Sequence, residues 1–161
     1  MDTEEPLLDQ LNRLCNSKTL ILTIGNTLRG DDAVGPLLFQ QLKGRITAEI
    51  INAGTVPENY IQTIIKKAPE VLLVIDAIDF AAPAGTIRIF KPSQLNSLVI
   101  STHTLSPRIF VDMITHAIDI QVYFLGIQPF QTQMGQPLSA AVDKAAQQLI
   151  SILTDVFGPG K

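Results

Sequence analysis

The sequence predicts a three-layer α/β/α domain with a mostly parallel, twisted sheet of about five strands. Two observations support this fold class. Continuous apolar runs at 19–24 and 71–76 have the length and composition of strands that are covered on both faces. Between such runs, apolar residues recur at helical spacing. The length of 161 residues suits one domain, 1–161, in which 1–18 form an additional N-terminal helical segment.

The first half of the chain alternates helix and strand. Residues 4–16 predict a helix with these side chains on one face: Leu7, Leu8, Leu11, Leu14 and Cys15. The strand at 19–24 leads to a helix at 32–43 with these residues inward: Val34, Leu37, Leu38 and Leu42. A strand at 47–52 then precedes a helix at 57–67, whose Pro57 suits the first helical turn.

In the second half, the strand at 71–76 is followed without a helix by an alternating segment at 86–90. We therefore expect 86–90 to be an antiparallel edge strand. Ser106 and Pro107 are typical of a helix start and open a helix at 106–117. A strand at 120–126 and a helix at 138–156 complete the pattern.

Composition excludes several classes of protein. The net charge of −3 and the lack of a basic stripe argue against nucleic-acid binding. No apolar run approaches the roughly 18 residues of a membrane span. The acidic N-terminus lacks the basic region of a secretory signal, so cytoplasm is the expected location. The single cysteine excludes an internal disulfide and a cysteine-rich metal cluster, and it is interpreted as a small buried apolar residue.

Polar residues gather where the predicted strands end. In parallel sheets ligands bind at the carboxyl ends of the strands. Gly25 and Asn26, the segment 52–54, Asp76 and the segment 126–128 all fall at such ends. The sequence thus predicts a site along one rim of the sheet.

Four acidic residues at this rim differ in expected role. Asp31 and Asp32 begin a helix, where a carboxylate caps free N–H groups; we assign that role to Asp31 and let Asp32 project to the rim. Asp76 ends an apolar run, so its charge needs a partner, a metal or the next turn to cap. Asp79 serves the loop or supports the site from behind.

The two histidines allow a functional and an ordinary interpretation. His103 lies in a polar loop before a helix, where a histidine is usually only solvated or hydrogen-bonded. Together with Asp32 and Asp76 it would complete an oxygen-rich metal site. His116, near the end of a helix, has a plain helix-dipole explanation.

Known catalytic and nucleotide motifs are missing. The spacing of Gly25, Gly30 and Gly35 is not that of a dinucleotide-binding or phosphate-binding loop, and it indicates tight turns or positive φ instead. Neither H-E-x-x-H nor G-x-S-x-G occurs. If the chain hydrolyses a bond, metal-bound water is therefore the natural attacker.

Taken in order, these motifs resemble those of the hydrogenase maturation endopeptidases. The similarity is carried by the following segments: Gly25–Gly35, Gly54–Asn59, Val74–Asp79, Pro83–Arg88, Ser101–His103 and Phe124–Pro129. Only about the first 18 residues fall outside it. The Pro-Glu-Asn and Gly-Ile-Gln-Pro pieces look most like the subtype that serves hydrogenase 3.

The resemblance implies an endopeptidase that removes a C-terminal extension from the large-subunit precursor of a nickel–iron hydrogenase. It maps the family's nickel-binding triad onto Asp32, Asp76 and His103, with the two aspartates also catalytic. Nickel would be carried by the precursor, and another divalent ion would fit the same ligands in a crystal. Two carboxylates and an imidazole bind metal less avidly than a cysteine cluster does, as a nickel sensor requires.

Further expectations follow from the resemblance. Gly25, Asn26 and Gly54 would contact the substrate, and Asp31 and Asp79 would support the ligands. Ala33 replaces a glycine of several relatives. The hydrogenase precursor is the expected partner, and a monomer the expected form. Two alternatives remain open: a non-catalytic nickel-binding maturation chaperone and a small-molecule hydrolase or phosphorylase on the same scaffold.

Overall fold

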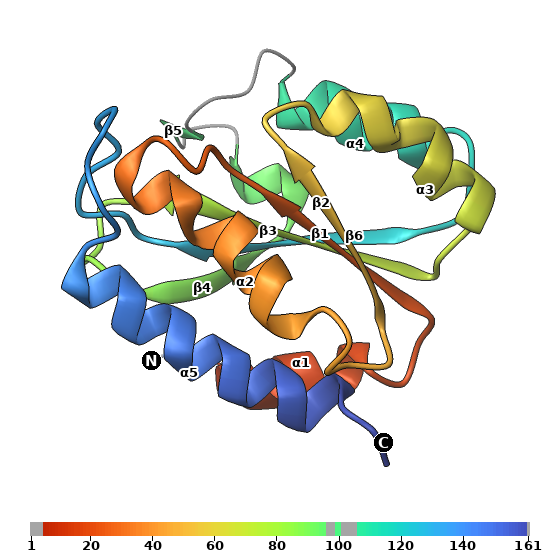
Figure 1. The fold of residues 1–161 in the computed structure, drawn as a ribbon. Helices are drawn as coiled ribbons and strands as arrows, with labels where there is room; N and C mark the ends of the chain where they lie inside the picture. Colours follow the sequence, from red (N-terminus) through yellow and green to blue (C-terminus); the bar gives the residue numbers. More distant parts are fainter. Residues whose placement is uncertain (1–4, 96–98, 101–105, 161) are drawn as a thin grey trace.

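The computed structural model describes residues 5–95, 99–100 and 106–160, and Figure 1 shows its arrangement. The helices are α1 (Leu7–Leu14), α2 (Val34–Leu42), α3 (Ile61–Lys67), α4 (Pro107–Thr115) and α5 (Ala140–Phe157). The strands are β1 (Thr19–Ile24), β2 (Glu49–Gly54), β3 (Val71–Asp79), β4 (Ile87–Phe90), β5 (Val99–Ile100) and β6 (Gln121–Ile127). Three 3₁₀ turns are η1 (Gly30–Ala33), η2 (Pro57–Tyr60) and η3 (Pro92–Leu95).

The strands form one mixed sheet in the order β2-β1-β3-β6-β4. The first four run parallel, while β4 pairs antiparallel with β6 at the edge, as the sequence predicts. Short β5 pairs antiparallel with the last two residues of β3, outside this path. The expected α/β fold with a mostly parallel sheet and one antiparallel edge strand is confirmed.

Alternate side chains of each central strand enter two separate cores, because successive strand residues point to opposite faces. In β1, Ile21 packs with α1, α2 and α5, whereas Leu20 and Leu22 pack with α3 and α4. Figure 1 shows α2 and α5 over one face of the sheet and α3 with α4 over the other. Both faces of β1 and β3 are thus covered, which explains their continuous apolar sequences.

Two strand boundaries differ from the sequence prediction in a way that affects the site. β3 continues to Asp79 rather than ending at Asp76, because Asp76 and Ala77 still pair with β6 and Ile78 is buried in the core. β2 runs to Gly54, so the segment 52–54 belongs to the strand. A single polar residue does not end a strand whose backbone is still paired.

The N-terminal segment packs on the body of the domain. Leu11 and Leu14 of α1 are buried in the core that α5 also lines, while Leu8, at the margin of the same helix face, is 46% exposed. Leu7 and Cys15 are partly buried against the same core. α1 therefore covers the sheet face beside α5.

The other differences are local. The helices predicted at 32–43 and 57–67 each begin as a 3₁₀ turn, η1 and η2, before the α-helix starts. The pairing of β5 was not expected from sequence. Within the described residues, no helix has the length and apolar character needed to cross a membrane.

Candidate active site

The turn after β1 is built by two close backbone approaches. A Cβ on Gly25 would lie 2.0 Å from the backbone oxygen of Asp32, and a Cβ on Gly35 would lie 2.2 Å from that of Ile24. Gly25 also has a φ of 154°, and its N–H donates to the Gly54 oxygen at 2.9 Å. The glycines therefore let η1 and α2 pack directly on the end of β1 and bring Asp32 to the rim.

Asp32 is fully buried, and its position is fixed by the chain just before it. The Asn26 N–H donates to Oδ2 of Asp32 at 2.8 Å. The side chain of Asn26 in turn accepts from the Leu28 N–H at 2.9 Å, which closes a local turn. Asn26 thus orients both the loop and the Asp32 carboxylate. The sequence had predicted only a contact between Asn26 and the substrate.

Asp76 lies inside β3, beside β1 in the sheet, and is 2% exposed. It pairs in register with Gly126 of β6. By strand alternation its side chain is on the same face as Val74 and Ile78, the face covered by α3 and α4. The η1 turn with Asp32 contacts β3. The structure thus places two buried carboxylates at the carboxyl side of adjacent parallel strands.

The third predicted ligand, His103, lies outside the described residues. Among residues 5–95, 99–100 and 106–160, no three histidine, cysteine or acidic side chains gather where they could hold a metal ion. The ligand set Asp32, Asp76 and His103 therefore stays a prediction.

Asp31, by contrast, does not act on its own helix. Its buried carboxylate accepts from the N–H groups of Phe130 at 2.8 Å and Gln131 at 3.2 Å, and from the N–H and Oγ of Ser139 at 2.6 and 2.8 Å. Ser139 is itself the N-cap of α5. Asp31 therefore ties the turn after β1 to the loop between β6 and α5, rather than capping its own first turn.

Asp79 and Gln128 organise the loop after β3. Buried Gln128 donates from Nε2 to Oδ1 of Asp79 at 3.0 Å, and its Oε1 accepts from the Phe80 N–H at 2.8 Å. The hydrogen bond from Gln128 Nε2, together with that from the Ala81 N–H, lowers the pKa of Asp79 below its usual 3.8. The sequence placed 126–128 at the rim but did not reveal that Gln128 holds this loop; a glutamine directly after an apolar strand was the available signal.

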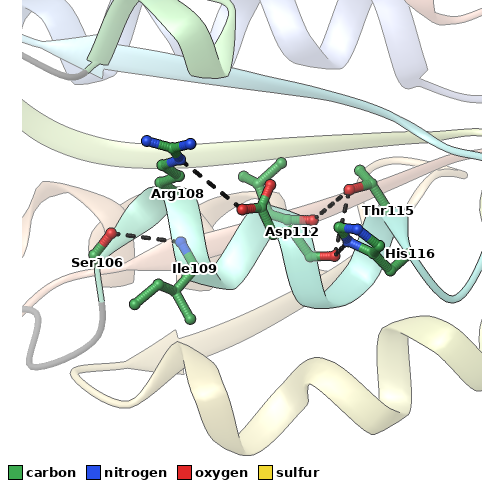
Figure 2. Close-up of polar contacts among 7 residues, drawn as sticks. Ser106, Arg108, Ile109, Asp112, Thr115 and His116 are labelled. Atoms are coloured by element: carbon green, nitrogen blue, oxygen red, sulfur yellow. Dashed lines mark hydrogen bonds and ion pairs between the residues drawn. The ribbon is translucent and has the colours of Figure 1, made fainter.

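The remaining predicted positions take simple roles. Gly54 has a φ of 58° and open space where a Cβ would lie, so no side chain covers the end of β2 at this position. His116 lies at the end of α4, where its N–H donates to the Asp112 carbonyl at 3.0 Å and Nδ1 lies 2.6 Å from the same oxygen (Figure 2). Figure 2 also shows Ser106 accepting from the Ile109 N–H at the start of α4, as its predicted cap. His116 therefore belongs to the helix end and not to the rim.

Comparison with known proteins identifies the family of this chain. A family model described as hydrogenase maturation protease matches residues 34–156, about three quarters of the chain. The chain belongs to the hydrogenase maturation protease family. The predicted enzyme class, a peptide-bond hydrolase of hydrogenase maturation, is thereby confirmed.

Individual relatives agree with this membership. The hydrogenase 3 maturation protease of Escherichia coli K12 is 34% identical over 137 residues, covering 81% of this chain and 87% of that protein. A putative hydrogenase maturation protease of Methanocaldococcus jannaschii is 31% identical over 164 residues and covers 96% of this chain and 95% of its own. The resemblance to the hydrogenase 3 subtype is thus confirmed.

Solved structures support the fold. The crystal structure of the [NiFe] hydrogenase maturation protease HycI from Thermococcus kodakarensis superposes with a TM-score of 0.81 at 27% identity, covering 92% of this chain and 97% of that one. A crystal structure of a hydrogenase 3 maturation protease gives a TM-score of 0.77 at 30% identity and covers 91% and 95% of the two chains. The layers and strand order described above are thus those of this family.

Proposed function

We propose that this protease removes the C-terminal extension of a nickel–iron hydrogenase large-subunit precursor after nickel has been inserted, and that it acts in the cytoplasm. The observation that carries the proposal is a pair of buried carboxylates at the rim where α/β sheets bind ligands: Asp32 in the turn after β1, and Asp76 in β3, the strand that pairs parallel with β1. Nickel enters as part of the substrate.

In this proposal Asp32, Asp76 and His103 contact the nickel that the precursor carries. His103 follows Ile100 by three residues in sequence, and Ile100 pairs with Ile78, two residues beyond Asp76. Two carboxylates and one imidazole suit a metal that must be sensed and then released. Such a contact would let the protease discriminate loaded from unloaded precursor.

The hydrolytic step needs no protein nucleophile. A water, deprotonated by Asp32 or Asp76 acting as general base or polarised by the precursor's nickel, attacks the carbonyl carbon of the scissile peptide. The new C–O bond forms, the C–N bond breaks, and the proton passes to the departing amine. Asn26 supports this role because its N–H fixes one oxygen of Asp32.

The test is a processing assay on nickel-loaded and nickel-free precursor, followed by intact mass. Wild type should release one C-terminal peptide from the loaded precursor only. Asp32→Asn and Asp76→Asn keep the side-chain shape and should each lower the rate at least 100-fold while remaining folded, whereas exposed Asp119→Asn should process within twofold of wild type.

Two results would contradict the proposal. Normal processing by both rim variants would show that the assignment of Asp32 and Asp76 is wrong. Stoichiometric binding of a processing-competent precursor by wild type, without any change in mass, would favour the chaperone alternative and leave the rim residues as ligands only.

A further inference from the structure

Three large apolar side chains are exposed on the loops that flank the candidate site: Leu28 (63% exposed), Phe130 (73%) and Met134 (58%), named here the apolar rim patch. Leu28 follows β1, and the other two follow β6. Single exposed apolar residues are ordinary, but neighbouring ones mark an interaction surface.

Backbone hydrogen bonds bring the members of the apolar rim patch together. The Gly135 N–H, next to Met134, donates to the Leu28 oxygen at 2.8 Å. The Asp31 N–H donates to the Gln131 oxygen at 2.9 Å, and the Asp31 carboxylate accepts from the Phe130 N–H. The two loops are therefore one hydrogen-bonded unit at this rim, and all three exposed apolar residues belong to it.

The same unit is continuous with the candidate catalytic turn. Asp31 holds the loop of Phe130, and the next residue, Asp32, is the proposed ligand and base. β1 and β6, the strands from which the two loops leave, lie on either side of β3 with Asp76. The apolar rim patch therefore lies on loops that leave the sheet at the same end as the candidate site.

The chemistry around the apolar rim patch defines its partner. From residue 120 to residue 142 the chain carries no charged residue and no histidine, although 17% of the whole chain is charged. Interface cores are enriched in aromatic residues and methionine and depleted of Lys, Glu and Asp. The partner surface that faces the loop of Phe130 and Met134 is therefore expected to be apolar and uncharged.

We propose that the apolar rim patch is the docking surface for the body of the folded precursor, through an apolar, uncharged area beside the root of its tail. This inference rests on the proposed function, since the occupant is the same protein whose tail is cut. Docking on the body separates recognition of the precursor from contact with its nickel. It gives affinity before cleavage and does not take part in the bond-breaking step.

The experiment compares Phe130→Ser/Met134→Ser with Leu8→Ser. Leu8 is also a large exposed apolar residue, but it lies on α1. Gln10 and Arg13 of the same helix line a pocket with the amino ends of β3 and β6, the end of the sheet opposite the candidate site. Kd for the nickel-loaded precursor is measured by biolayer interferometry, and KM and kcat are measured in the processing assay. The double variant should raise Kd and KM at least tenfold, about 1.4 kcal/mol, with kcat within twofold; Leu8→Ser should change neither.

A Kd within twofold of the control overturns the inference, as does a wild-type dimer by sedimentation that the double variant abolishes without weakening precursor binding. Leu28→Ser, an independent variant on the other loop, should also raise Kd. It therefore tests the inference even if the double variant fails to fold. Because Kd is measured apart from cleavage, the two proposals fail separately. If the double variant raises Kd but wild type cleaves nothing, docking is supported and the proposed cleavage is refuted. If wild type cleaves normally but the double variant leaves Kd unchanged, the cleavage is supported and docking is refuted.

Discussion

Replacing Asp31 by asparagine tests the contact between the turn after β1 and the loop after β6. The carboxylate is fully buried and accepts four hydrogen bonds, from Phe130, Gln131 and twice from Ser139. Asparagine keeps one acceptor oxygen and turns the other into an NH₂ donor. Its best orientation keeps the oxygen at the Oδ2 position, where three donors converge, and sets the NH₂ against the N–H of Ser139.

The expected loss in the free energy of unfolding follows from these contacts. One charge-assisted hydrogen bond, worth about 1.5–3 kcal/mol, disappears, and the partly buried N–H of Ser139 faces the new NH₂ without an acceptor, at a cost of about 1–3 kcal/mol. The sum is about 2.5–6 kcal/mol, a large part of the roughly 5–15 kcal/mol that stabilises a typical domain. At about 2–4 °C per kcal/mol for a chain of this size, Tm should fall by at least roughly 5 °C.

The assay is urea and thermal unfolding followed by circular dichroism, with Asp119→Asn as the matched control. Asp119 is an exposed aspartate before β6, and its replacement should change the free energy of unfolding by less than about 0.5 kcal/mol. If Asp31→Asn unfolds with the stability of this control, the four hydrogen bonds do not anchor the loop and the account of the rim is wrong.

Two further perturbations address the glycine turn and the loop after β3. Gly25→Ala places a Cβ 2.0 Å from the Asp32 oxygen and should cost more than about 3 kcal/mol by chemical denaturation; Gly54→Ala meets no atom within 4 Å and should cost only the left-handed backbone strain of about 1–2 kcal/mol, so equal losses would contradict the packing argument. The pKa of Asp79 is lowered in the folded state, so its contribution to stability is present above its unfolded pKa of about 3.8 and is lost as pH falls through the folded value. Gln128→Leu removes the first cause of this shift and should raise the Asp79 pKa in a carboxyl NMR titration, and an unchanged pKa would show that Gln128 is not its main partner.

Local patterns were enough to place most of the secondary structure. The run 19–24 coincides with β1, and the antiparallel edge strand was expected because 86–90 follows its predecessor without a crossover helix. Errors arose where a local signal was weaker than a distant pairing. Asp76 looked like a strand end, yet β6 pairs with β3 through Ala77. β5, with only two residues, exists by pairing with β3.

The candidate site divides in the same way. Local sequence was enough to locate the glycine turn and the two buried aspartates, since each stands within a few residues of an apolar strand: Gly25 and Asp32 follow β1, and Asp76 lies in β3. The hydrogen-bond partners of Asp31, by contrast, could be found only from the folded chain. Its partners lie 99 to 108 residues away and meet it because the sheet places β1 and β6 on either side of β3. Hydrophobic periodicity reports which face of a segment is buried, but a long-range hydrogen bond depends on which loops the strand order brings together.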